Sequence, residues 1–151
     1  MPYPPKPARA DFLSSEDRLM ATAIGPSGEW VGYYTYPAKP AMCPMHQMLE
    51  FSAGHIRGAG IDNPGQFVID GSYDDATGRV QWTKKYLGKH DVRYEGTVSL
   101  GEITGSWSLT PPKQGRELHG HFRIWPLPDG QYGDDEPLQS VLEKEIRRKT
   151  E

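Results

Sequence analysis

Lys84 is the residue whose surroundings in the sequence point most directly to chemistry. In the stretch QWTKKY it alternates with Trp82 and Tyr86, so an extended chain places its ammonium group on an aromatic face. A buried ammonium group needs a partner or water, and here it could hold the anionic head of a bound molecule. Two alternatives stay open: a β-bulge at TKK, or a lysine whose stem lies inside while its head reaches solvent.

Aromatic side chains with the same alternation would provide the walls of such a site. Apolar rings with a few hydroxyl groups are typical of small-ligand pockets. The same rings would equally form an ordinary core, with their hydroxyls at its rim. The ligand-binding candidates are Lys84, Tyr34, Trp82, Tyr86, Tyr94 and Trp107, and Trp30, Tyr36 and Tyr73 share their face.

Two stretches contain residue types that bind metals. His119 and His121 are two residues apart, a spacing that can chelate a metal on a strand, but the sequence supplies no third ligand and we favour a solvated outer face. The stretch MCPMHQM gathers soft ligands suited to Cu(I). Short clusters of this kind have no fixed geometry, and we favour an ordinary loop leading into a strand. We therefore predict neither a metal site nor a cofactor.

No sequence motif identifies a reaction. The chain has no nucleophile elbow, P-loop, dinucleotide fingerprint or HExxH helix. Lys84, His90 and the tyrosines are acid or base groups of a general kind. The sequence leaves catalysis undecided and favours a protein that is not an enzyme.

The composition limits the classes of partner. A chain of 151 residues fits one domain, and a net charge of −3 argues against a general nucleic-acid binder. A single cysteine, Cys43, excludes an internal disulfide and fits a reducing compartment. No apolar stretch resembles a signal peptide or a membrane span. We expect a soluble, cytoplasmic protein with no nucleic-acid or membrane partner.

The candidate residues lie in stretches whose apolar period is two residues. These stretches begin at Glu29 and are separated by turn signals such as DNPG, DDATG and LGKH. They predict about eight strands, or seven if SAGH is only a kink. Because the linkers are short and none offers a crossover helix, we expect sequential antiparallel hairpins in an up-and-down meander.

Glycines recur at the centre of these strands, in EITGSW, WVGYY, IRGAG, IDGSY, YEGTV and LHGHF. Each lies on the face that carries the aromatic rings. Glycine in a strand relieves bending and leaves room for a neighbouring ring, which favours a closed barrel over a flat sandwich. About eight strands enclose an interior that side chains fill or that holds one small ligand.

Three regions are predicted along the chain. Residues 1–28 form a Pro-rich arm and a short helix, residues 29–126 form the barrel, and residues 127–151 form a loop and a C-terminal amphipathic helix. In that helix Leu138, Val141, Leu142 and Ile146 make one apolar stripe. We expect the helix to cover an end of the barrel or to pack on a partner chain, as in a homodimer.

The strand pattern from WVGYY to LHGHFRI, about residues 29–125, resembles the meander of calycin-like barrels, the group that contains avidins, lipocalins and fatty-acid-binding proteins. The resemblance is one of pattern and implies an eight-stranded barrel, often with a small hydrophobic ligand at one mouth. No ligand-contacting residue of the group matches this chain.

We expect from this a barrel that binds a small, mostly apolar molecule in its interior or at one mouth, without catalysis. Two other hypotheses are kept: a filled barrel that serves as a protein-interaction or oligomerisation module, and an enzyme acting on a small hydrophobic substrate. A large internal cavity would favour a binder or an enzyme, and a packed interior would favour the interaction module.

Overall fold

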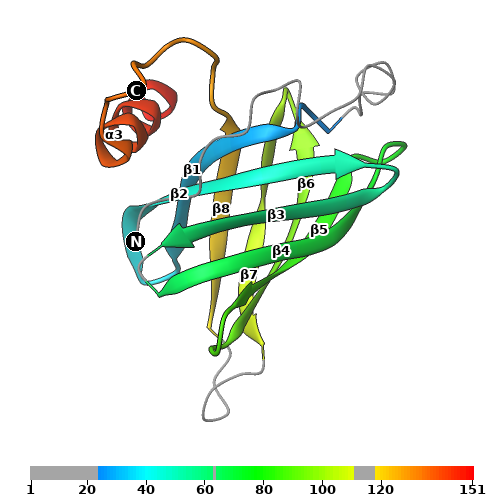
Figure 1. Ribbon diagram of the computed structural model, residues 1–151. Coiled ribbons are helices and arrows are strands. Elements are labelled where there is room, and N and C mark those ends of the chain that lie inside the picture. Colours follow the sequence, from blue (N-terminus) through cyan, green and yellow to red (C-terminus); the bar gives the residue numbers. More distant parts are fainter. Residues whose placement is uncertain (1–23, 63, 111–117) are drawn as a thin grey trace.

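The protein is a closed β-barrel with a helix on its outside, as described by a computed structural model for residues 24–62, 64–110 and 118–151 (Figure 1). Eight strands follow one another in sequence order, neighbours pair antiparallel, and β1 closes the barrel on β8. The elements are β1 (Gly28–Tyr36), β2 (Lys39–Ser52), β3 (His55–Asp62), β4 (Gly65–Asp74), β5 (Arg79–Tyr86), β6 (Asp91–Ser99), β7 (Glu102–Thr110), β8 (His119–Pro126) and α3 (Leu138–Thr150). The predicted all-β up-and-down barrel and the C-terminal helix are confirmed.

The structure settles one open question about the strands and corrects one expectation. SAGH is a tight two-residue turn between β2 and β3, with Ala53 and Gly54 at φ 50° and 84°, so the strand count is eight and not seven. Strand β2 begins at Lys39, so MCPMHQM belongs to a strand and the expected loop is wrong. The predicted N-terminal helix lies outside the described residues.

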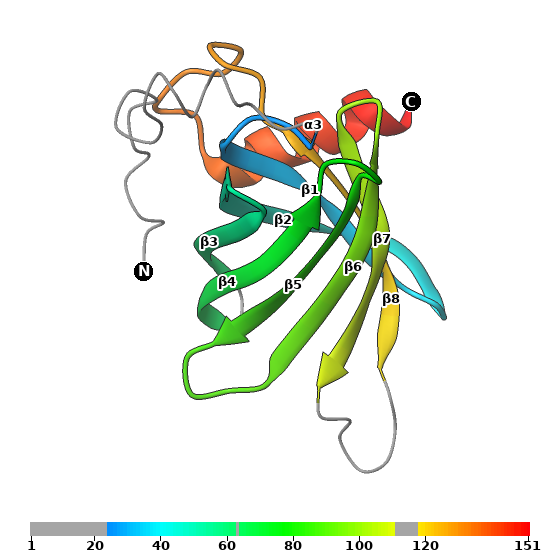
Figure 2. The ribbon, with the colours of Figure 1, turned by 90° about the vertical axis from the view of Figure 1, so that its right-hand side faces the viewer.

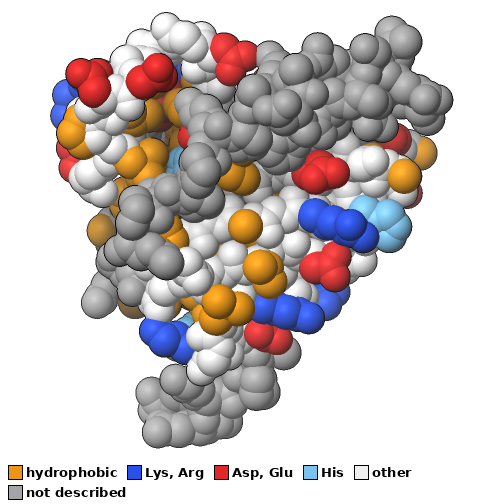
Figure 3. Space-filling view, in the orientation of Figure 1, with side chains coloured by type: hydrophobic (Ala, Val, Ile, Leu, Met, Phe, Trp, Pro, Cys, Tyr) orange, Lys and Arg blue, Asp and Glu red, His pale blue; other side chains and the backbone are white. Residues whose placement is uncertain are grey.

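Alternation along the strands separates an apolar interior from a polar exterior. On β5, for example, Val80, Trp82, Lys84 and Tyr86 are buried while the residues between them are intermediate or exposed. Outward positions on neighbouring strands carry charges of both signs, which Figure 3 shows interspersed over one face. The inner rings touch one another: Trp82 stacks on Tyr94 at 5.3 Å between centroids, and Phe122 meets both edge-on. The rings thus fill the middle of the barrel.

The glycines on the inner face mark places where neighbouring strands come very close. A Cβ atom added to Gly105 would lie 1.9 Å from the carbonyl oxygen of Glu95 and 2.5 Å from the Cα atom of Gly96. At Gly60 the obstacle is a ring, that of Phe67, at 2.4 Å. The sequence predicted room for rings, and the structure adds that the adjacent backbone is the nearer obstacle at most of these positions.

The two ends of the barrel differ. One end is closed by apolar side chains: Ile24 and Trp30 are fully buried there, and the Trp30 indole donates to the Pro26 carbonyl at 2.9 Å. Gln47, also buried, donates to the Trp30 carbonyl at 2.8 Å. At the opposite end β1, β3, β5 and β7 finish and β2, β4, β6 and β8 begin. We call this opposite end the mouth.

Helix α3 packs on the outer wall of the barrel and does not cover an end (Figures 1 and 2). Its predicted apolar stripe is real: Val141 and Leu142 are buried, and Leu142 packs with Val31 of β1 and Trp125 of β8. The expectation that the helix covers a barrel end is therefore wrong. Trp125 and Val31 point outward from their strands, which gives the stripe an apolar partner on the wall of its own chain.

A buried carboxylate, Glu145, joins the helix to the barrel. It accepts hydrogen bonds from the indole of Trp125 at 2.9 Å, the hydroxyl of Tyr132 at 2.6 Å and the guanidinium of Arg148 at 2.7 Å. Burial alone would raise the pKa of this carboxyl, but the hydrogen bonds from Arg148, Tyr132 and Trp125 outweigh it and leave the pKa below its usual value. Its charged form therefore stabilises the docked helix.

Replacing Glu145 by glutamine is expected to lower the free energy of unfolding by about 1–3 kcal/mol at neutral pH, because buried partners lose a charged acceptor. A folded-state pKa below the usual value means that the contribution is present at neutral pH and is lost as the pH falls through the folded pKa. Urea unfolding followed by tryptophan fluorescence at neutral and acidic pH measures both effects. The matched control is Glu143→Gln on the exposed side of the helix; equal effects of the two changes would contradict the assignment.

Candidate functional site

The inner face of the mouth holds an ion pair whose lysine is buried and whose aspartate is partly exposed. The Lys84 ammonium group lies 2.9 Å from Oδ2 of Asp62, at the end of β3, and the Tyr86 hydroxyl donates to the same oxygen at 2.7 Å. The Lys84 side chain is 6% exposed and that of Asp62 30%. Strand β5 pairs without interruption through Lys84 with both neighbours. Neither alternative for Lys84, a bulge or a head in solvent, is correct.

Aromatic rings surround the ammonium group of Lys84. It lies 4.2 Å from the centroid of the Phe67 ring, 5.2 Å from that of Tyr86 and 5.9 Å from that of Tyr94. Ring faces attract a cation, most strongly when it is shielded from water. Burial lowers the pKa of Lys84 below its ordinary value, and the Asp62 carboxylate offsets part of that effect.

The remaining candidates lie on the same inner surface. Tyr34 and Tyr36 meet the indole of Trp107 edge-on, at 6.0 and 5.1 Å between centroids. The Trp107 indole N–H donates to the Thr35 carbonyl at 3.1 Å. Trp82 lies deeper, stacked on Tyr94. We call Asp62, Lys84, Tyr86, Tyr94, Tyr34 and Trp107 the mouth cluster.

The mouth cluster thus contains five of the six residues singled out from the sequence, while the sixth, Trp82, lies deeper against Tyr94. The structure adds Asp62 and Phe67 to this surface. Asp62 was missed because it is the first residue of DNPG and so reads as part of a turn. The signal was nevertheless present: Ile56, Gly58 and Gly60 alternate, and the next residue in that series is Asp62. Strict alternation carried to the last residue of a strand would have found it.

Tyr34, Tyr86 and Tyr94 are held in their neutral forms. Burial is the largest cause and raises the pKa of all three hydroxyls above the usual tyrosine value, and the negative charge of Asp62 raises them further. The hydrogen bond from the Tyr86 hydroxyl to Asp62 adds to the effect. At neutral pH the mouth cluster therefore presents protonated tyrosine hydroxyl groups beside the contact between Lys84 and Asp62.

In a spectrophotometric titration, these three tyrosines are expected to stay protonated where exposed tyrosines ionise, near pH 10. Because their pKa values are raised in the folded state, the protein loses stability as the pH rises above the unfolded value, and ionisation accompanies unfolding. Tyr86→Phe should remove one of the tyrosine ionisations that occur above about pH 10. Reversible ionisation of all eight tyrosines in a single step near pH 10 would contradict the burial of the cluster.

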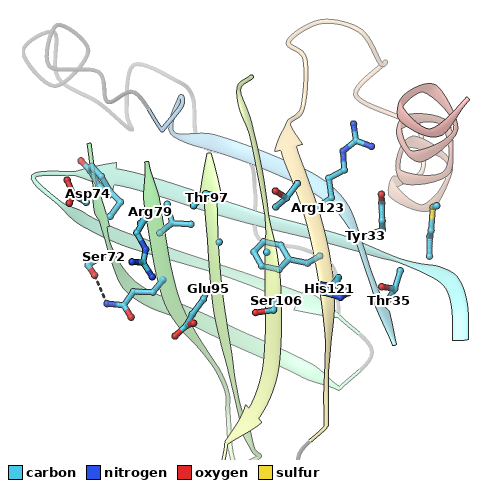
Figure 4. A pocket seen from close by; sticks show the side chains of 18 residues that line it. Tyr33, Thr35, Ser72, Asp74, Arg79, Glu95, Thr97, Ser106, His121 and Arg123 are labelled. Carbon is cyan, nitrogen blue, oxygen red and sulfur yellow. Dashed lines mark hydrogen bonds between the residues drawn. The ribbon is translucent and has the colours of Figure 1, made fainter. Parts of the chain in front are cut away.

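A separate groove of about 1080 Å³ lies on the outer face of the barrel (Figure 4). Outward side chains of β4 to β8 and β1 form two rows across it. The first row is Ser72, Gln81, Glu95, Ser106, His121 and Thr35, and the second is Asp74, Arg79, Thr97, Thr104, Arg123 and Tyr33. His119 is exposed nearby on β8 and His121 lines the groove, so both histidines point outward as the sequence indicated.

The groove and the mouth cluster share no residue. Outward side chains make up most of the groove's lining, and the core residues Tyr73, Val80 and Phe122 also contribute to it. Among the described residues, no three or more His, Cys, Asp or Glu side chains lie close enough to hold a metal ion. Within that same part of the chain, no helix has the length and apolar character of a membrane span.

Comparison with known proteins identifies no relative: no protein-family model, no curated protein and no solved structure matches the chain. The candidate sites therefore have to be judged from their own geometry.

Proposed function

We propose that the protein binds a small, mostly apolar molecule at the mouth of its barrel, against the mouth cluster. The main support is the ion pair between Lys84 and Asp62. Two charges in an aromatic interior stabilise a fold weakly, since their desolvation offsets their attraction. A core needs neither, whereas a ligand site uses a few placed polar groups among apolar walls.

The site is proposed at the mouth and not in the middle of the barrel. The rings of Trp82, Tyr94 and Phe122 are in mutual contact in the middle, and the opposite end is plugged by Ile24 and Trp30. At the mouth, the Tyr36 residue is 38% exposed and the Asp62 side chain 30%. The closed meander also supports placing the chain among calycin-like barrels, which the strand pattern resembles.

Native mass spectrometry of the protein purified from its own host tests this function. The expected spectrum shows the chain with an added small mass that disappears on denaturation. The same measurement on Trp107→Ala, which removes one wall of the mouth cluster, is expected to show less of the complex. A chain that carries no additional mass at the lowest activation energy contradicts the proposal.

A second function, the interaction module, is favoured by two observations: the outer groove, and the ring-filled middle of the barrel, which is the packed interior expected of such a module. Its lining is largely polar and carries both signs of charge, with Glu95 in the first row and Asp74, Arg79 and Arg123 in the second. Such a surface fits the hypothesis of an interaction module that binds an extended segment of another protein. Substitutions at Glu95 and His121 would weaken binding of that partner and leave small-molecule binding at the mouth unchanged.

A further inference from the structure

One oxygen of the Asp62 carboxylate is buried and, among the residues that the structure describes, has no hydrogen-bond partner. Both donors that reach this carboxylate, the Lys84 ammonium group and the Tyr86 hydroxyl, go to Oδ2. Atom Oδ1 is shielded from solvent and accepts nothing. Leaving a buried acceptor unpaired is unfavourable, and more so when the group is charged.

The charges around this oxygen restrict what can approach it. Lys84 and Asp62 already neutralise each other at 2.9 Å. A carboxylate ligand would meet the negative charge of Asp62, and an ammonium ligand would add a second positive charge beside Lys84. An uncharged hydroxyl or amide N–H group satisfies Oδ1 without placing a new charge in an aromatic interior.

The aromatic side chains around the ion pair indicate the shape of the apolar part of such a ligand. Phe67, Tyr86 and Tyr94 enclose the ion pair, and Tyr34 and Trp107 lie edge-to-face on the same inner surface. Aromatic side chains pack favourably against a ring, either offset-stacked or edge-on. The apolar part of the ligand that best matches these side chains is therefore a flat ring.

We infer that the mouth of the barrel selects an uncharged ring compound that donates a hydrogen bond, from a hydroxyl or amide group, to Oδ1 of Asp62. This inference rests on the proposed function and goes further by assigning the polar group of the ligand. It replaces the anionic head expected from the sequence, because Lys84 serves here to hold Asp62 in place.

The test compares four probes of one size: benzyl alcohol, toluene, benzoate and benzylamine. Their dissociation constants are measured by NMR titration of the Trp107 indole N–H signal in the full chain. Benzyl alcohol is expected to bind at least about tenfold more tightly than toluene, because only the alcohol donates a hydrogen bond to the charged acceptor. Benzoate and benzylamine are expected to bind more weakly than the alcohol.

The double variant Asp62→Leu/Lys84→Met removes the acceptor and both charges while keeping apolar volume. It is expected to bind toluene and to lose the preference for the alcohol, with the two dissociation constants within about twofold. Preference for benzoate or benzylamine in the natural protein, or an alcohol preference retained in the double variant, would overturn the inference while leaving binding at the mouth intact. Failure of all four probes to bind the natural protein would count against the proposed function itself.

Discussion

Replacing Gly105 by alanine is expected to abolish the native barrel or to destabilise it by more than about 4 kcal/mol, the range reached only by severe steric or packing defects. The added methyl group would stand 1.9 Å from the Glu95 carbonyl oxygen and 2.5 Å from the Cα atom of Gly96. Both obstacles are backbone atoms of β6, which pairs with β7 along its whole length. A side chain in the way could rotate, whereas here the strands themselves must separate.

The matched control is Ser106→Ala, the next residue on the same strand. Ser106 is exposed and points outward into the groove, so its change should stay within about 0.5 kcal/mol. Circular dichroism and urea unfolding of both variants measure the difference. A Gly105→Ala protein as stable as the Ser106→Ala protein would show that the inward glycines are not required for closure of the barrel.

The second large effect concerns the ion pair at the mouth. Asp62→Leu should destabilise the protein by about 3–5 kcal/mol, because it leaves the buried Lys84 ammonium group without its partner. Lys84→Met should cost less, about 1–2 kcal/mol, because the Asp62 side chain it leaves behind is 30% exposed and can be solvated. The asymmetry follows from the 6% exposure of Lys84.

The double variant Asp62→Leu/Lys84→Met should recover most of the loss caused by Asp62→Leu alone. Apolar groups that replace a buried ion pair are often neutral for stability, and only the Tyr86 hydroxyl then lacks its acceptor. The double-mutant cycle from urea unfolding gives the coupling between the two residues. Additive losses, with the double variant least stable of all, would show that the two charges do not depend on each other.

Much of this architecture could be predicted because strands with one buried face must alternate. That rule placed Lys84, Tyr86 and Tyr94 on the inner face, and turn residues marked where each strand ends. It could not pair Lys84 with Asp62, 22 residues earlier in the sequence, since that contact depends on the tilt and register of a closed sheet. The placement of α3 could not be predicted, because an apolar stripe on a helix does not determine which surface the helix packs against.

The outer groove shows the same limit. Its two rows contain ordinary polar residues such as Ser72, Thr97 and Ser106, which any solvated strand face would carry. The groove is assembled from residues of seven strands that lie far apart in the sequence, so no local pattern encodes it. The sequence gives no cue to its size.

The most direct test of ligand binding at the mouth uses the four tryptophans, whose indole N–H groups report from different places. Trp107 lies at the mouth, Trp82 in the middle, Trp30 at the closed end, and Trp125 outside under α3. We predict that, in an NMR screen of uncharged aromatic fragments, binding shifts the Trp107 signal first and most, with the backbone signals of Tyr34 and Tyr94. Fragments that leave Trp107 unmoved and shift instead Glu95, Ser106 and His121 would place the binding site in the outer groove and contradict the account.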